Sequence, residues 1–106
     1  MKTNQLTRGR TRRVMYVENK DGDLDGAGGR IGWVTFSQTG LSVYYRGRTL
    51  KRSKRDVRGN YFDEATGDEY WISGVKARGS NAHWAESIRV EIDADAREEY
   101  LRIRGL

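Results

Sequence analysis

Apolar side chains in this sequence occur in short alternating runs, and this pattern limits the possible folds more than any other feature. In the clearest example, Ile88, Val90 and Ile92 alternate with two charged residues. A period of two places every second side chain on one face of a β-strand, so the run predicts a half-buried strand. No apolar run is longer than residues 14–17, and the chain has 13 glycines and no proline. The sequence therefore predicts short strands joined by glycine turns, without a signal peptide or a transmembrane helix.

Six segments carry this strand pattern. Residues 37–40 and 65–68 are short glycine-containing connections that predict hairpins between the segments on either side of them. Gly47 lies inside the third segment, where a glycine indicates a bend. The predicted strands are Arg12–Glu18, Ile31–Phe36, Leu41–Thr49, Asn60–Asp63, Glu69–Lys76 and Ile88–Ile92.

The C-terminal segment predicts an amphipathic helix. Asp93 is positioned to cap its N-terminus, Glu98 and Arg102 form an i,i+4 pair, and Gly105 is placed to end it. The expected fold is mainly β: a small SH3-like or Sm-like barrel of five or six short antiparallel strands with one C-terminal α-helix. A chain of 106 residues is one domain, here 12–106, preceded by a flexible basic arm at 1–11.

Charge is unevenly distributed along the chain. Residues 1–58 carry 14 Lys or Arg and 5 Asp or Glu, whereas residues 59–106 carry 6 and 10. The first half therefore favours an anionic partner. The chain has no cysteine, which excludes disulfides and thiolate chemistry and, together with the absence of a targeting segment, indicates the cytoplasm. We expect no cofactor.

Basic residues interleaved with aromatic residues form the strongest functional pattern. Arginine suits phosphate because its planar guanidinium binds two oxygens at once. Basic groups beside stacking aromatics are typical of proteins that bind RNA or single-stranded nucleic acid, and Tyr44 and Tyr61 adjoin the basic run in sequence. The candidate phosphate contacts are Arg46, Arg48, Lys51, Arg52, Lys54, Arg55 and Arg58, together with Arg12 and Arg13 of a second cluster.

Two other functions stay open. The acidic hairpin Asp63–Glu69 can meet the basic half of a second copy, which would make the chain a protein-interaction or self-assembly module without nucleic acid. The third function is an enzyme that uses His83, the one histidine, although no catalytic motif surrounds the neighbouring serines. Asp21, Asp23 and Asp25 match the start of a calcium loop, but Gly32 stands where that loop requires a glutamate, so we expect an acidic turn and no metal.

Three segments, GRIGWVTFSQTGLSVYYRGR (29–48), GNYFDEATGDEYWISGVKARG (59–79) and HWAE (83–86), together with AREEYLRIR (96–104), resemble a family of small, uncharacterised bacterial proteins of about 100 residues. Some members carry a deoxyxylulose-phosphate synthase label. A thiamine-diphosphate enzyme needs several domains, so the resemblance implies no activity and no site residue for this chain. This chain has Ser53-Lys54-Arg55-Asp56 where the family is expected to have glycines, which makes the basic loop a feature of this protein.

Overall fold

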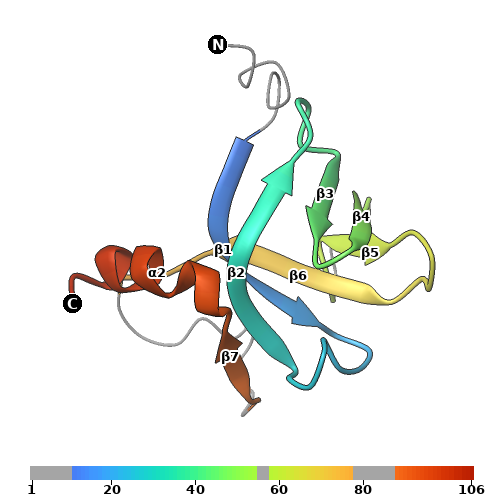
Figure 1. The fold of residues 1–106 in the computed structure, drawn as a ribbon. Helices are drawn as coiled ribbons and strands as arrows, with labels where there is room; N and C mark the ends of the chain where they lie inside the picture. Colours follow the sequence, from blue (N-terminus) through green and yellow to red (C-terminus); the bar gives the residue numbers. More distant parts are fainter. Residues whose placement is uncertain (1–10, 55–57, 78–87) are drawn as a thin grey trace.

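The computed structural model describes residues 11–54, 58–77 and 88–106, and six of its strands close into an antiparallel barrel (Figure 1). The strands follow the order β1-β6-β5-β4-β3-β2, and pairing of β1 with β2 completes the ring. The predicted small antiparallel barrel is therefore confirmed. Its strands are β1 (Thr11–Asn19), β2 (Gly29–Phe36), β3 (Ser42–Tyr45), β4 (Arg48–Arg52), β5 (Tyr61–Asp63) and β6 (Glu69–Gly74).

The third predicted strand, Leu41–Thr49, is two strands in the structure. Arg46 and Gly47 have φ values of 47° and 79°, and they form a two-residue turn that reverses the chain between β3 and β4. Two consecutive positive φ values match the twist of a β-hairpin, whereas the sequence had indicated only a bend. The connection after the predicted strand Leu41–Thr49 consequently begins later, because Leu50, Lys51 and Arg52 belong to β4.

The last predicted strand is shorter than expected and pairs differently. Only β7 (Val90–Ile92) is extended, and it lies parallel to the first residues of β2, outside the ring. The backbone N–H of Gly29 donates to the carbonyl of Arg89, and the N–H of Asp93 donates to the carbonyl of Ile31. The expected alternation is incomplete, since the Val90 side chain is exposed. The structure therefore has a seventh strand that adds to the barrel rather than closing it.

Inward-facing side chains of all six barrel strands form the main core. Alternation along each strand sends every second side chain inward, as with Val17 in β1, Val34 in β2 and Val43 in β3. Register then places Leu50 opposite Val43. The buried residues of this cluster are Val17, Leu24, Val34, Val43, Tyr45, Leu50, Tyr61, Tyr70 and Ile72.

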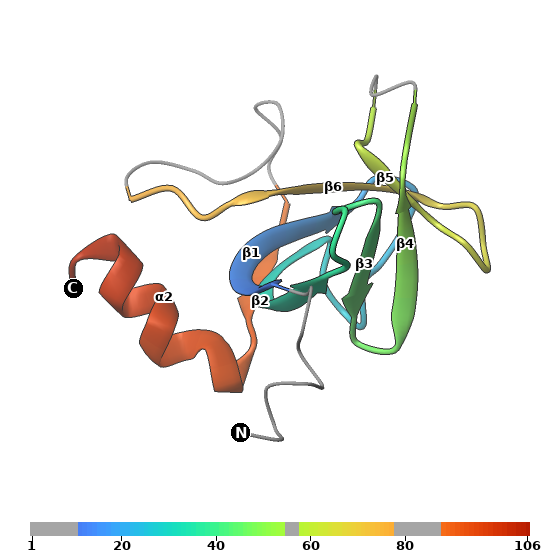
Figure 2. The same ribbon diagram turned by 90° about the horizontal axis from the view of Figure 1, so that it is seen from above.

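A 3-10 turn (Ala94–Ala96) and helix α2 (Arg97–Arg104) cover the outside of β1 and β2 (Figure 2). Ala96, Tyr100 and Ile103 share the face that packs on the barrel, so the segment is amphipathic. Gly105 ends the helix in a left-handed conformation, as predicted. Within the described residues, no helix has the length and apolarity that a membrane crossing requires.

Two predicted contacts of the helix are wrong. Arg102 donates to Glu99 at 2.9 Å rather than pairing with Glu98. The Asp93 side chain makes no capping hydrogen bond. Its carboxylate contacts the barrel instead, because β7 directs Asp93 toward β2 and β3.

Candidate functional site

The predicted basic run does not form one continuous surface. Because the chain reverses at Arg46 and Gly47, Arg48 begins β4 at one end of the barrel and Arg52 ends it at the other. Four steps of about 3.3 Å along a strand separate these two residues by about 13 Å. The run therefore divides into two groups with different surroundings.

One carboxylate from the loop after β1, that of Asp25, pairs with both arginines of the first group. Arg46 Nε lies 2.7 Å from Asp25 Oδ2, and Arg48 Nη2 lies 2.9 Å from Asp25 Oδ1. Hydrogen bonds from Arg48 and then Arg46 hold the pKa of Asp25 well below its usual value. Both predicted phosphate contacts are thus engaged within the chain, and the acidic segment that resembled a calcium loop supplies their counterion.

Asp93 joins the C-terminal segment to the same end of the barrel. Its carboxylate accepts hydrogen bonds from Arg30 Nη1 at 3.0 Å and from the Tyr45 hydroxyl at 2.5 Å. Burial and the neighbouring Asp93 raise the pKa of Tyr45, so its hydroxyl stays a donor. Gly32 lies beneath both groups, and a Cβ there would overlap them. At this end of the barrel the arginines already contact Asp25 and Asp93, and Asp25, Arg46 and Arg48 line an open depression of about 650 Å³.

Arg58, the last residue of the predicted run, also contacts acidic residues. Its guanidinium lies 2.8 Å from Asp21 Oδ1 and 3.5 Å from Glu69 Oε2, and it donates to the carbonyl of Lys20 at 2.7 Å. The backbone N–H of Glu69 donates to Asp21 and makes the largest contribution to lowering its pKa, and the Arg58 guanidinium lowers this pKa further. Within the chain, Arg58 thus joins the loop after β1 to β6, and its phosphate contact stays a prediction.

Arg52 and Lys54 form the second group, and both side chains are exposed. The Arg52 guanidinium carbon lies 5.6 Å from the centre of the Tyr61 ring, which is a cation–π distance. Lys51 precedes them on the outer face of β4, where its ammonium donates to Ser42 Oγ at 3.0 Å.

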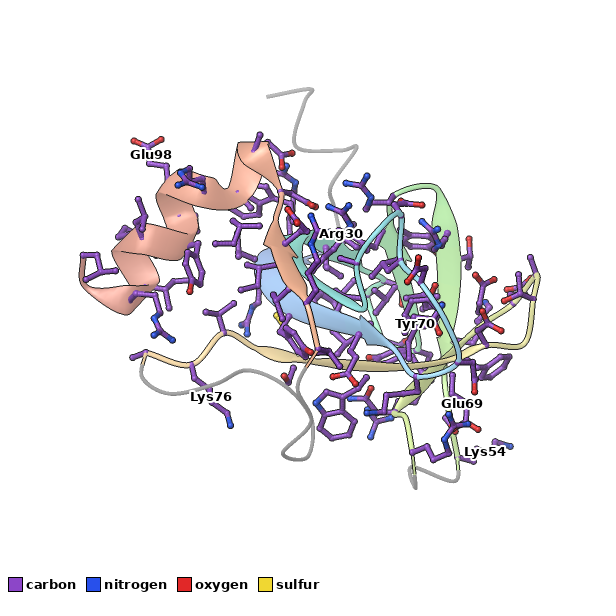
Figure 3. All side chains as sticks on the ribbon, turned by 90° about the horizontal axis from the view of Figure 1, so that it is seen from below. Arg30, Lys54, Glu69, Tyr70, Lys76 and Glu98 are labelled. Atoms are coloured by element: carbon purple, nitrogen blue, oxygen red, sulfur yellow. The ribbon has the colours of Figure 1, made fainter. Side chains whose placement is uncertain are left out.

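These cations border an open groove of about 740 Å³ between the end of β4 and the β5–β6 hairpin. Its apolar part is made by Leu41 and Phe62, which are 58% and 37% exposed. Figure 3 shows Lys54 and Glu69 on this side of the barrel. The groove is lined by Leu41, Ser42, Lys51, Arg52, Ser53, Lys54, Phe62, Gly67 and Glu69.

The two predicted stacking residues differ in accessibility. Tyr44 points outward from β3 and is 36% exposed. Tyr61 points into the barrel, is 6% exposed and donates its hydroxyl to the carbonyl of Gly40, which excludes it from stacking on a ligand. Phe62 is the exposed ring of β5, because neighbouring residues of a strand face opposite sides. Because Phe62 directly follows Tyr61, the sequence indicates that one of the two rings faces outward, but alternation alone does not show which one.

The cations of β1 lie on opposite faces of their strand. The Arg12 guanidinium stacks on Trp33, 4.3 Å from the ring centre, beside the helix. Arg13 is exposed and lines a small depression with Phe36 and Gly40. Gly40 directly precedes Leu41, which lines the groove. Arg13 is therefore the β1 cation nearer to the groove.

Several predicted residues lie outside the described part of the chain. These are residues 1–10 of the arm predicted at 1–11, Arg55 of the basic run, and the segment 78–87 with His83 and its neighbouring serines. Thr11, the last residue of the predicted arm, begins β1. The structure therefore leaves the enzyme hypothesis untested.

The acidic hairpin meets cations of its own chain. Asp63 is buried, and its carboxylate accepts the N–H of Ala65 at 2.8 Å, which organises the turn. Glu64 lies 3.6 Å from Lys51, and Glu69 pairs with Arg58. The charge complementarity that predicted self-assembly is thus partly satisfied within one molecule.

Comparison of the chain with protein-family models, with curated proteins and with solved structures finds no match. The resemblance to small bacterial proteins, and the likeness to SH3 or Sm barrels, stay predictions. The case for a function therefore depends on the geometry of the groove.

Proposed function

We propose that the chain is a non-enzymatic cytoplasmic module that binds single-stranded nucleic acid, RNA or DNA, in the groove beside Phe62. The observation that carries the proposal is the grouping of an exposed aromatic ring with exposed cations. Phe62, Lys51 and Lys54 line the same groove, and Arg52 lines it from the end of β4, where register pairs it with Tyr61. The arginines at the other end of the barrel, by contrast, contact Asp25 and Asp93.

Each part of the groove matches one part of a nucleotide. Arg52 and Lys54 offer charge-assisted contacts to phosphate oxygens. The Phe62 ring offers a face for a base, and such stacking tolerates any sequence because every base has a π-face. Leu41 extends the apolar surface from the opposite strand.

The position of helix α2 also supports the proposal, because the helix lies away from the groove. Helix α2 covers the outside of β1 and β2, whereas β4 and β5 lie on the other side of the barrel (Figures 1 and 2). On their outer face, register places Lys51 between Ser42 and Phe62. Tyr44 lies on the same face, two residues further along β3. Single-stranded nucleic acid lying across β3, β4 and β5 would contact Phe62, Lys51 and Tyr44.

Fluorescence anisotropy with labelled single-stranded oligonucleotides tests the proposal. Binding should weaken steeply as salt rises, because phosphate contacts release counterions. The variant Arg52→Gln/Lys54→Gln should bind weakly, with a log–log salt slope smaller by about 1.4. Lys76→Gln/Arg97→Gln removes the same charge elsewhere and should keep most of the affinity.

One further variant tests the aromatic part. Phe62→Leu keeps an apolar side chain but removes the stacking face, and should weaken binding by about fivefold or more. Equal loss in both double-charge variants would mean that only net charge matters and would contradict a site in the groove. No binding at low salt, combined with concentration-dependent self-association in sedimentation, would instead favour the assembly module.

A further inference from the structure

The exposed Phe62 ring has carboxylates beside it as well as cations. Glu69 pairs directly with Phe62 across β5 and β6, and side chains that face each other in this way have Cβ atoms about 5 Å apart. Glu64 follows Phe62 by two residues, and its backbone N–H donates to the carbonyl of Thr49 in β4, so hydrogen bonding between β5 and β4 continues to this point. Glu69 therefore adjoins the ring from β6 and Lys51 adjoins it from β4, and both line the groove with Phe62. The Glu64 carboxylate lies 3.6 Å from the Lys51 ammonium, at the border of this groove.

These carboxylates are accessible. The side chains of Glu64 and Glu69 are 58% and 40% exposed. Their ion pairs are long, at 3.6 Å to Lys51 and 3.5 Å to Arg58. Each carboxylate thus keeps oxygen lone pairs that can accept a hydrogen bond from a ligand.

A carboxylate beside a stacked base discriminates among bases by their edges. Cytosine carries an amino group at position 4, adenine carries one at position 6 and guanine one at position 2, and all three donate hydrogen bonds. Uracil and thymine carry carbonyl oxygens on both sides of their one N–H. These oxygens are repelled by a carboxylate, which accepts hydrogen bonds and cannot donate them.

We propose that Glu64 and Glu69 select the base that stacks on Phe62, so that the groove accepts amino-bearing bases and rejects uracil and thymine. This inference rests on the proposed function, because it specifies the ligand of the same groove. The cations provide affinity through the phosphates, and the carboxylates provide specificity by favouring one base edge and penalising the other.

Cytosine and uracil offer the sharpest comparison, because both are pyrimidines and differ at position 4. The probes are fluorescein-labelled rC10 and rU10 at neutral pH, titrated with the full chain. The wild-type chain should bind rC10 about fivefold more tightly than rU10. In Glu64→Gln/Glu69→Gln the ratio should approach one, since a glutamine amide both donates and accepts. Affinity for both probes should rise, because two negative charges near the phosphates are lost.

The control is Asp95→Asn/Glu98→Gln, which removes the same charge near the helix; Figure 3 shows Glu98 far from Glu69. This control should keep the cytosine preference. Equal binding of the two probes by the wild-type chain, or an unchanged preference in Glu64→Gln/Glu69→Gln, would overturn the inference and leave the proposed function standing. Failure to bind either probe at low salt would overturn both.

Discussion

Asp25 and Arg46 both have positive φ, at 54° and 47°, and their side chains bind each other at 2.7 Å. They are the two non-glycine residues in this conformation within the part of the chain that the structure describes. The left-handed region costs a residue with a Cβ about 1–2 kcal/mol. Arg46 occupies the first position of the β3–β4 turn, where asparagine, aspartate or glycine is the usual residue. The contacts of Arg46 with Asp25 and Asp93 offset this cost.

Replacing Arg46 separates the backbone effect from the ion pairs. Arg46→Ala and Arg46→Gly both lose the contacts with Asp25 and Asp93, but only glycine adopts a positive φ without strain. Arg46→Gly should therefore be more stable than Arg46→Ala by about 1 kcal/mol in urea unfolding. Equal stability of the two variants would show that the turn relaxes when the side chain is removed.

The lowered pKa of Asp25 predicts a loss of stability in acid. Its carboxyl has a lower pKa in the folded chain than the usual 3.8 because Arg48 and Arg46 donate hydrogen bonds to its ionised form. The stabilisation is therefore fully present above about pH 4 and is lost as the pH falls through the folded-state pKa. Urea unfolding between pH 7 and pH 2 should show this decline, and Asp25→Asn should show a smaller one. Asparagine suits the comparison because it tolerates a positive φ.

Gly32 is the position where an added methyl group should do most harm. A Cβ there would overlap the Asp93 carboxylate and the Tyr45 hydroxyl, which hydrogen-bond each other at 2.5 Å. Gly32→Ala should destabilise the chain by about 2 kcal/mol and lower Tm by about 10 °C. Gly74→Ala is the matched control, because a Cβ at Gly74 meets no atom within 4 Å. A Gly32→Ala variant as stable as this control would show that Asp93 does not hold the segment after β7 in place.

The side-chain amide of Asn60 takes the place of a paired backbone residue beside Ile72 of β6. Its amide nitrogen donates to the carbonyl of Ile72 at 2.7 Å, and its amide oxygen accepts the N–H of Ile72 at 2.8 Å. Both contacts are buried, so Asn60→Ala leaves two backbone groups without partners and should cost about 3 kcal/mol in thermal or urea unfolding. Asn60→Asp keeps the acceptor but loses the donor, and should also be destabilised. A loss below 1 kcal/mol in Asn60→Ala would mean that water replaces the amide.

Alternation and glycine placement were sufficient to predict the barrel, because these signals are local. The hairpin around Gly67 and the C-terminal helix were predicted for the same reason. The β3–β4 turn was missed because an Arg-Gly pair does not itself favour two positive φ values; the contact with Asp25, 21 residues away, holds it. The parallel pairing of β7 with β2 also depends on residues far apart in the sequence.

The candidate site was less predictable than the fold. A run of basic residues gives the charge of a segment but not the carboxylates that other segments bring to it. Asp25 precedes Arg46 by 21 residues and Asp93 follows it by 47, so neither contact could be predicted from local spacing. Tyr61 and Phe62 differ by one position, and the register with β4 and β6 decides which ring faces the solvent.

The pairing of β7 with β2 predicts an order of folding. The barrel strands complete their ring between Thr11 and Gly74, whereas β7 adds only three residue pairs to the outside of that ring. Arg30 and Asp93 are 63 residues apart, and their contact needs β2 and β3 already in position. We therefore expect the C-terminal segment to join a preformed surface and to be the first of the described segments to leave it during partial unfolding. In native-state hydrogen exchange, amides of β7 should open at lower free energy than those of β1.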